Sequence, residues 1–371
     1  MIRLEKRLAP STAASIISPL IAIALTILCG LLMIQAAGKD PVEAFNTYFM
    51  FPFNDLAAYF NAAPENRSGL LYLPAEVLVK AIPLALIGVG LAIAFRAGLF
   101  NIGAPGQYIL GAIFAGAVAL HVSDSLPRPI VLPLCLAAGA LGGLLWALIP
   151  AFLRVRTGAS EILTSLMLSY VAALLLDWLV RGVWKDPLGF GFPQSKDFPD
   201  SALMPILLEG TRLHWGLVLM LAVVFAVWFV MFRTITGFRV TVTGLAPKAA
   251  HFAGFNQRGT VYTVFLLSGA LAGLAGALEA TATIGQLQPE ISAEYGFAAI
   301  IVAFLGRLHP LGVLFAALVL AITYIGGENA QITMGLPKNA TLVFQGMLLL
   351  FLLACDAMIH YRLRWRRVKG A

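Results

Sequence analysis

The chain contains a succession of long apolar segments, and these restrict its fold more than any other feature. A helix needs roughly 20 apolar residues to cross the ~30 Å hydrocarbon core of a bilayer. From apolar length and from the charges that bound each segment, we expect about ten spans. They cover about 15–37, 73–95, 105–121, 130–151, 161–180, 214–232, 260–280, 294–306, 311–327 and 340–360. The sequence therefore predicts an all-α, polytopic membrane protein.

Composition supports a membrane location. Of the 371 residues, 60% are hydrophobic and only 12% are charged, whereas soluble domains carry about 25% charged residues. The net charge of +7 comes from Lys and Arg in short loops and tails beside the apolar segments, which argues against nucleic acid as a partner. Cys29, Cys135 and Cys355 stand singly in apolar segments, so we expect neither disulfides nor a metal site.

The basic residues also predict an orientation. Lys and Arg gather in the cytoplasmic loops of membrane proteins. Here they cluster in alternate loops, around Arg96, Arg154 and Arg239, and in the C-terminal tail. This pattern predicts a multi-pass protein of a bacterial plasma (inner) membrane with both termini in the cytoplasm, which requires an even number of crossings. The segment 294–306 is too short to cross the membrane as a helix by itself. Whether it completes a crossing or forms half of a broken helix stays open.

Two stretches interrupt the apolar pattern. The first break (96–107) carries three glycines and Pro105, and the second break (288–296) reads Gln-Pro-Glu-Ile-Ser-Ala-Glu-Tyr-Gly. Non-helical backbone at membrane depth occurs only where it is buried in protein or lines a cavity. Interruptions at matching places in two halves are typical of transport sites. We therefore predict one transmembrane domain, 1–371, with inverted repeats at about 73–180 and 260–360.

The cytoplasmic loop 233–259 contains a candidate docking helix in its core, the coupling segment (237–254). Pro247 suits the first turn of a helix and Gly254 suits a left-handed stop, which leaves about two turns. Helices this short are unstable alone in water, so this one is expected to be docked against a partner surface. The small Ala249 and Ala250 permit close approach, and Phe252 offers a large apolar contact.

Three groups of residues carry a resemblance to a known family. Gly237-Phe-Arg, Gly244, Pro247 and Ala253-Gly254 resemble the coupling loop of the ABC importer permeases that serve branched-chain amino acids, ribose-type sugars and nucleosides. Both breaks are similar to those of the nucleoside and simple-sugar branch, and the resemblance covers most of residues 75–355. Ala246 departs from the family, which commonly has a polar capping residue there. Losing such a cap costs on the order of 1 kcal/mol of helix stability.

The resemblance implies a permease subunit that forms a translocation pathway for nucleosides or related compounds, with simple sugars as the alternative substrate. It also implies three partners: an ABC ATPase subunit, a second permease subunit that is a different chain, and an extracytoplasmic substrate-binding protein. The chain has no Gly-x-x-x-x-Gly-Lys-Ser/Thr phosphate loop, so ATP hydrolysis is expected on the separate subunit. We expect no catalytic residue, metal or cofactor in this chain.

Two sets of residues are candidates for function. The first set would couple the permease to the ATPase, and the second would line the pathway, where amides can pair with a neutral polar ligand and aromatic faces can stack on a base or sugar ring. An open alternative is that Asn101 and Gln107 only satisfy backbone groups freed by the break. The coupling set is Gly244, Pro247, Ala249, Ala250, Phe252 and Gly254; the pathway set is Phe100, Asn101, Gln107, Tyr108, Glu294, Tyr295 and Phe297.

The remaining charged and polar features leave alternatives open. An ion- or proton-coupled carrier would need titratable groups deep in the spans, but Lys80, Asp177 and Glu279 lie within about two turns of span ends and are expected to reach the interface. Glu161 has either a packing or coupling role, or simply favours a helix N-terminus. The aromatic loop 181–215, here named the cap loop, is either a dock for a binding protein or a structured cap.

Overall fold

The computed structural model describes residues 2–6, 12–63, 67, 69–122, 126–291, 294–337 and 339–365. Among these residues, nine helices are long and apolar enough to cross a membrane, which confirms the predicted all-α polytopic architecture. The chain divides into two compact units, Met1–Asn54 with Ile322–Ala371 and Asp55–Ala321. Ser292 and Ala293 of the second break, and the last basic residues of the C-terminal tail, lie outside the described residues.

The smaller unit is built on two helices from opposite ends of the chain. α1 (Thr12–Ala36) packs against α14 (Asn339–His360), and the Ser18 hydroxyl donates to Asp356 Oδ1 over 2.7 Å. The short helices α2 (Pro41–Phe45) and η1 (Asn46–Met50), and the start of α3 (Phe51–Asn61), complete this unit. Buried Tyr48 stacks on Phe344, with 5.1 Å between ring centroids.

A small sheet joins the two ends of the chain. β1 (Ile2–Lys6) pairs antiparallel with β2 (Tyr361–Trp365), and Ile2 lies opposite Trp365. No local pattern predicts these strands, because each is only five residues long and its partner lies at the other end of the chain. The pairing brings the two ends side by side.

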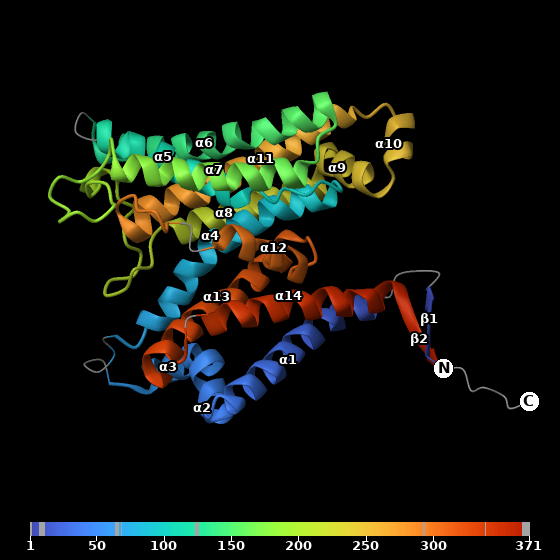
Figure 1. Cartoon of the computed structure of the whole chain (residues 1–371), viewed down its shortest axis with the longest axis horizontal. Helices are drawn as coiled ribbons and strands as arrows, with labels where there is room; N and C mark the ends of the chain where they lie inside the picture. Colours follow the sequence, from blue (N-terminus) through green and yellow to red (C-terminus); the bar gives the residue numbers. More distant parts are fainter. Residues whose placement is uncertain are drawn as a thin grey trace, which may run out of the picture. The chain divides into compact units, whose positions relative to one another are not determined.

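The larger unit contains the predicted breaks and the coupling segment. Its long helices run alongside one another, with α9 and α10 at one end and the cap loop at the opposite end (Figure 1). We call these ends the coupling end and the cap end. The helices are α4 (Tyr72–Arg96), α5 (Ala104–His121), α6 (Arg128–Thr157), α7 (Glu161–Arg181), α8 (Gly216–Arg233), α9 (Ile235–Leu245), α10 (Pro247–Phe252), α11 (Gln257–Leu278), α12 (Tyr295–Leu305) and α13 (Pro310–Met334), which enters the smaller unit after Ala321.

Glycines let three helices of this unit approach closely. α11 packs against both α5 and α6. A Cβ atom at Gly143 would clash with the carbonyl oxygen of Gly269, and one at Gly273 would clash with that of Gly139. Small residues at such crossings are how membrane helices pack without a hydrophobic driving force. These glycines therefore serve close helix packing.

The helix α12 is too short to cross a bilayer by itself. Its 11 residues extend about 16 Å at a rise of 1.5 Å per residue. At the cap end, the Leu287 carbonyl accepts from the Ser195 backbone N–H over 2.9 Å. At the coupling end, the Leu308 carbonyl accepts from Arg96 Nε over 2.8 Å. The stretch between Leu287 and Leu308 therefore runs from the cap end to the coupling end, and only its second half is helical. This arrangement agrees with the prediction that 294–306 is half of a broken helix.

Candidate functional site

The coupling segment contains the predicted short helix. α10 has Pro247 in its first turn, and the chain leaves the helix through Gly254, whose φ is +76°. Ala246 precedes the helix and provides no side-chain cap. The expected helix and its missing cap are therefore both confirmed.

Other contacts compensate for the missing cap. Gln257 Nε2 donates to the Pro247 carbonyl over 2.8 Å and ties the start of α10 to the start of α11. Ala250 is fully buried, whereas the Phe252 side chain is 90% exposed. Phe252 also borders an open surface pocket of about 470 Å³ that is lined by Pro247, Lys248, His251 and Gln257. α10 thus packs through Ala250 and presents Phe252 outward, whereas Ala249, expected to allow close approach, is exposed.

The first break lies directly against the coupling segment. α4 ends at Arg96, and Gly98, with φ +70°, turns the chain away from the helix axis. A Cβ atom at Gly244 of α9 would clash with the carbonyl oxygen of Arg96. The predicted interruption is confirmed, and its near end forms the surface on which α9 rests.

A buried amide network closes the first break. Asn101 and Gln107 are 0% and 1% exposed. Asn101 Nδ2 donates to Gln107 Oε1 over 2.9 Å and to Ser268 Oγ over 3.0 Å, and Gln107 Nε2 donates back to Asn101 Oδ1 over 3.0 Å. Asn101 Oδ1 also accepts from the Gly103 backbone N–H over 3.2 Å. The network both satisfies a freed backbone group and fastens the break to α11 through Ser268.

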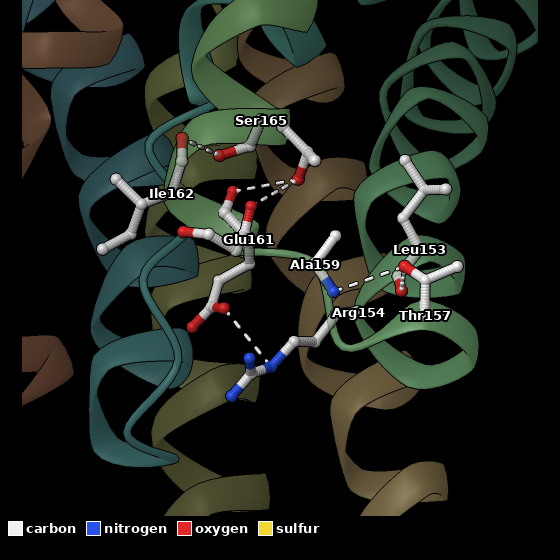
Figure 2. Close-up of polar contacts among 9 residues, drawn as sticks. Leu153, Arg154, Thr157, Ala159, Glu161, Ile162 and Ser165 are labelled. Atoms are coloured by element: carbon white, nitrogen blue, oxygen red, sulfur yellow. Dashed lines mark hydrogen bonds and ion pairs between the residues drawn. The ribbon is translucent and has the colours of Figure 1, made fainter.

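α7 supports the other side of the first break. Figure 2 shows Arg154 at the end of α6 reaching toward Glu161 at the start of α7, with Arg154 Nε 3.3 Å from Glu161 Oε2. One turn further along α7, Ser165 leaves no space for a side chain at Gly103. The Ser169 hydroxyl accepts from the Gly106 backbone N–H over 3.3 Å. Glu161 is therefore buried at the start of α7, the helix that packs against the first break. Its ion pair with Arg154 favours a packing role.

The two breaks meet inside the larger unit. The Tyr108 hydroxyl donates to the Ile291 carbonyl over 3.3 Å. The rings of Tyr108 and Tyr295 lie edge to face, with centroids 6.2 Å apart, and both residues are fully buried. Gly296 faces Pro105 so closely that a Cβ atom would clash with it. The structure thus brings together segments that lie almost 200 positions apart in the sequence.

The other predicted pathway residues lie at less buried positions. Phe100 is 40% exposed and packs on Phe95, with ring centroids 5.5 Å apart. Phe297 is 42% exposed. Glu294 is exposed and has a left-handed backbone, φ +61°, immediately before α12. Four of the seven predicted residues are therefore buried: Tyr108 and Tyr295 lie where the two breaks meet, and Asn101 and Gln107 form the amide network of the first break. The other three lie at more exposed positions.

Charged residues near the cap end were missed or misread from the sequence. Buried Glu76 accepts from Arg212 Nε over 2.8 Å, and its second oxygen accepts from Arg212 Nη2. This pair raises the pKa of Arg212, because the hydrogen-bonded carboxylate stabilises the charged guanidinium. Glu279 is 6% exposed, so the expectation that it reaches the interface is wrong. No sequence spacing links Glu76 to Arg212, which explains why the pair was missed.

The cap loop is a structured element. Its backbone N–H groups at Ser195, Phe198 and Met204 donate to carbonyls of Leu287, Gly285 and Thr281 over 2.7–2.9 Å. The buried His214 ring accepts from the Gly216 N–H over 3.2 Å, and burial lowers its pKa to about 4. Phe190 of the cap loop is 98% exposed. The loop is therefore fixed to η5 (Glu279–Ile284) and the residues after it.

Comparison with known proteins identifies a matching family and several relatives. The family described as "Branched-chain amino acid transport system / permease component" matches residues 73–353. The glucose ABC transporter permease protein TsgB13 of Haloferax volcanii is 36% identical over 93% of this chain and 89% of its own length. The guanosine ABC transporter permease protein NupP of Bacillus subtilis is 30% identical over 95% and 97%. The nucleoside ABC transporter permease protein NupB of Lactococcus lactis is 28% identical over 91% and 90%.

The family match spans both breaks and the coupling segment, and it covers well over half of the chain. The chain therefore belongs to the family of branched-chain amino acid transport system permease components, which are multi-pass membrane proteins.

Proposed function

We propose that this chain is the membrane-spanning permease subunit of an ABC importer and that its coupling segment binds an ATPase carried on a separate subunit. The observation that carries the proposal is that this segment exposes an apolar side chain on one side and packs against the first break on the other. Phe252 is 90% exposed beside an open pocket, whereas Gly244 lies against the carbonyl of Arg96 at the first break. A partner that binds Phe252 is thereby linked to the break through a short rigid segment.

The contacts suggest how movement would reach the pathway. A permease of this kind does no bond chemistry; it has two conformations, and a partner that binds them differently shifts their populations. Displacement of α9 would act on Arg96 and the first break, and then through Asn101 and Ser268 on α11. Packed elements with little free space transmit such shifts because they cannot deform continuously. The pathway residues proposed here are Phe100, Asn101, Gln107, Tyr108, Glu294, Tyr295 and Phe297.

We place the coupling end in the cytoplasm of a bacterial cell, because the basic residues gather there. The pairing of β1 with β2 supports a location of both termini on one side, since paired strands cannot lie on opposite faces of a membrane. The nine long apolar helices found among the described residues would alone give an odd number of crossings. The broken segment that ends in α12 supplies the tenth crossing. In the inverted repeats proposed for 73–180 and 260–360, this segment is the counterpart of the first break.

A second permease subunit and an extracytoplasmic binding protein complete the proposed importer. The cap loop is the candidate dock for the binding protein, because its fixed backbone exposes Leu188 and Phe190, which are 83% and 98% exposed. Exposed apolar residues on a structured loop are typical of interaction surfaces. By analogy with the named relatives, the solute is a nucleoside or related compound, with a simple sugar as the alternative.

The test is co-purification of the ATPase subunit with Phe252→Asp. A charge at this position would remove the apolar contact and place a carboxylate in the interface, so the variant should insert normally but lose the ATPase and ATP-driven uptake. Phe190→Asp is the matched control for ATPase co-purification alone, because it introduces the same charge at a similarly exposed aromatic of the cap loop. Full retention of the ATPase by Phe252→Asp would contradict the proposal.

A further inference from the structure

Two carboxylates are buried among the helices of the larger unit near its cap end. Glu76 of α4 is 3% exposed and Glu279 of η5 is 6% exposed. An ionisable side chain within a membrane span is costly, at about 2.5 kcal/mol or more, and such groups usually pair with one another and mark a transport route. Each carboxylate therefore needs an explanation.

Glu76 has a structural explanation. It receives two hydrogen bonds from the Arg212 guanidinium, the bidentate arrangement that suits a carboxylate. Next to it, Ala75 and Val79 of α4 pack on Leu213 in one buried cluster. This pair therefore fastens the cap loop to α4 and uses both oxygens of Glu76.

Glu279 lies within electrostatic range of Tyr108, which contacts the second break. It interacts electrostatically with Lys80 and is hydrogen-bonded to the Thr283 side chain, while Tyr108 lies within its electrostatic reach. Lys80 Nζ lies 5.5 Å from the ring centroid of Tyr295, which in turn contacts Tyr108. A carboxylate, an ammonium group and two tyrosines are thus gathered around one point.

The backbone at Glu279 is also unusual. Residues Glu279–Ile284 form a π-helix that continues α11. π-Helical turns are rare and occur frequently at functional sites, because the wider turn redirects side chains. In η5 this turn begins at the buried carboxylate itself.

We propose that Lys80 and Glu279 form a recognition pair in the translocation pathway that binds the hydroxyl and ring heteroatom groups of a neutral polar solute. The inference rests on the proposed function and deepens it. A carboxylate accepts hydrogen bonds from neighbouring hydroxyl groups, an ammonium group donates to carbonyl or ring nitrogen acceptors, and tyrosine faces stack on flat rings.

The local charge favours a neutral solute. The charged groups that act on this point are two carboxylates, Glu76 and Glu279, and two cations, Lys80 and Arg212. When both carboxylates are ionised these charges balance, which leaves no surplus positive charge to compensate a phosphate group. Burying an uncompensated anion is strongly unfavourable. The pair should therefore pass nucleosides in preference to nucleotides.

The experiment uses the complete importer in proteoliposomes, with radiolabelled guanosine as the probe. Glu279→Gln and Lys80→Met should each lower the uptake rate about tenfold or more, the loss expected when a hydrogen bond to a charged group is removed. Lys80→Arg keeps the charge and should retain most of the uptake. Asp177→Asn is the matched control, because Asp177 pairs with Arg181 at an exposed site on α7 and should not affect uptake.

A labelling measurement separates recognition from a merely structural role. In the Lys80→Cys variant, a cationic methanethiosulfonate reagent added from the binding-protein side should react with the new thiol during turnover, and saturating guanosine should slow the reaction. This result does not require the variant to transport at a normal rate. Wild-type uptake in Glu279→Gln and Lys80→Met, or a labelling rate that guanosine leaves unchanged, would overturn the inference. If the unmodified importer takes up neither guanosine nor glucose, it is the proposed function that fails.

Discussion

The carbonyl oxygen of Arg96 lies directly against the α-carbon of Gly244, and no side chain can be placed between them. Arg96 ends α4 at the first break, and Gly244 belongs to α9 in the coupling segment. The contact therefore joins the segment proposed to bind the ATPase to the segment proposed to line the pathway. Its consequences can be tested one residue at a time.

Gly244→Ala should uncouple transport. The added methyl group would clash with the Arg96 carbonyl, so α9 and the break must separate, at a cost of about 1–3 kcal/mol for overpacking. We expect guanosine uptake by the reconstituted importer to fall several-fold while ATP hydrolysis continues. Gly346→Ala is the control, because nothing lies within 4 Å of a Cβ atom there. If Gly244→Ala and the unmodified protein showed the same ratio of guanosine uptake to ATP hydrolysis, the coupling role would be contradicted.

Asn101→Ala should destabilise the permease. Removing this amide leaves Gln107 and Ser268 without the hydrogen bonds they now make in a buried site, and each unsatisfied buried group costs about 1–3 kcal/mol. The apparent melting temperature of the detergent-solubilised protein should fall by several degrees. Asn54→Ala, at an exposed position of α3, should leave it unchanged. An unchanged melting temperature in Asn101→Ala would show that the network does not fasten the break.

The Glu76–Arg212 pair should respond asymmetrically to substitution. Arg212→Gln leaves a buried carboxylate without its cation, which typically costs about 3–5 kcal/mol. Glu76→Gln leaves Arg212, whose side chain is 49% exposed and can be hydrated. Protease cleavage within the cap loop should therefore rise strongly in Arg212→Gln and only slightly in Glu76→Gln or in the double variant. Equal sensitivity of the two single variants would rule out this account of the pair.

His214 should make the cap loop sensitive to acid. Its pKa is lowered to about 4 by burial, below the value of about 6.5 for the unfolded chain. Because the unfolded state binds the proton more readily, this contribution to stability is full above about pH 6.5 and is lost as the pH falls toward 4, up to about 3 kcal/mol. The melting temperature should drop between pH 7 and pH 5 in the unmodified protein, and less in His214→Asn. If the melting temperatures of the unmodified protein and of His214→Asn fell equally between pH 7 and pH 5, His214 would be excluded as the cause of the acid sensitivity.

Features encoded by local sequence could be predicted. Apolar length predicts the spans, and Pro247 and Gly254 predict the bounds of the docking helix. The short segment at 294–306 was recognised as too brief to cross, and its helix has 11 residues.

Features that depend on tertiary contact could not be predicted. Glu76 and Arg212 are separated by 136 positions, and no local pattern marks them as partners. Glu279 lies close to a span end in sequence, but the helix continues as η5 and the cap loop bonds to Thr281 and Gly285 beyond it, so its position along the helix did not reveal its burial. The mutual hydrogen bonds of Asn101 and Gln107 likewise appear only when the chain folds back at the first break.

The most direct test of the central claim is guanosine accumulation in proteoliposomes that contain the permease pair, with and without the ATPase subunit. With the binding protein and ATP supplied, the account predicts accumulation only when the ATPase is present, and none when an ion or proton gradient is imposed on the permease pair alone. Gradient-driven accumulation without the ATPase would contradict it and would identify the chain as a secondary carrier.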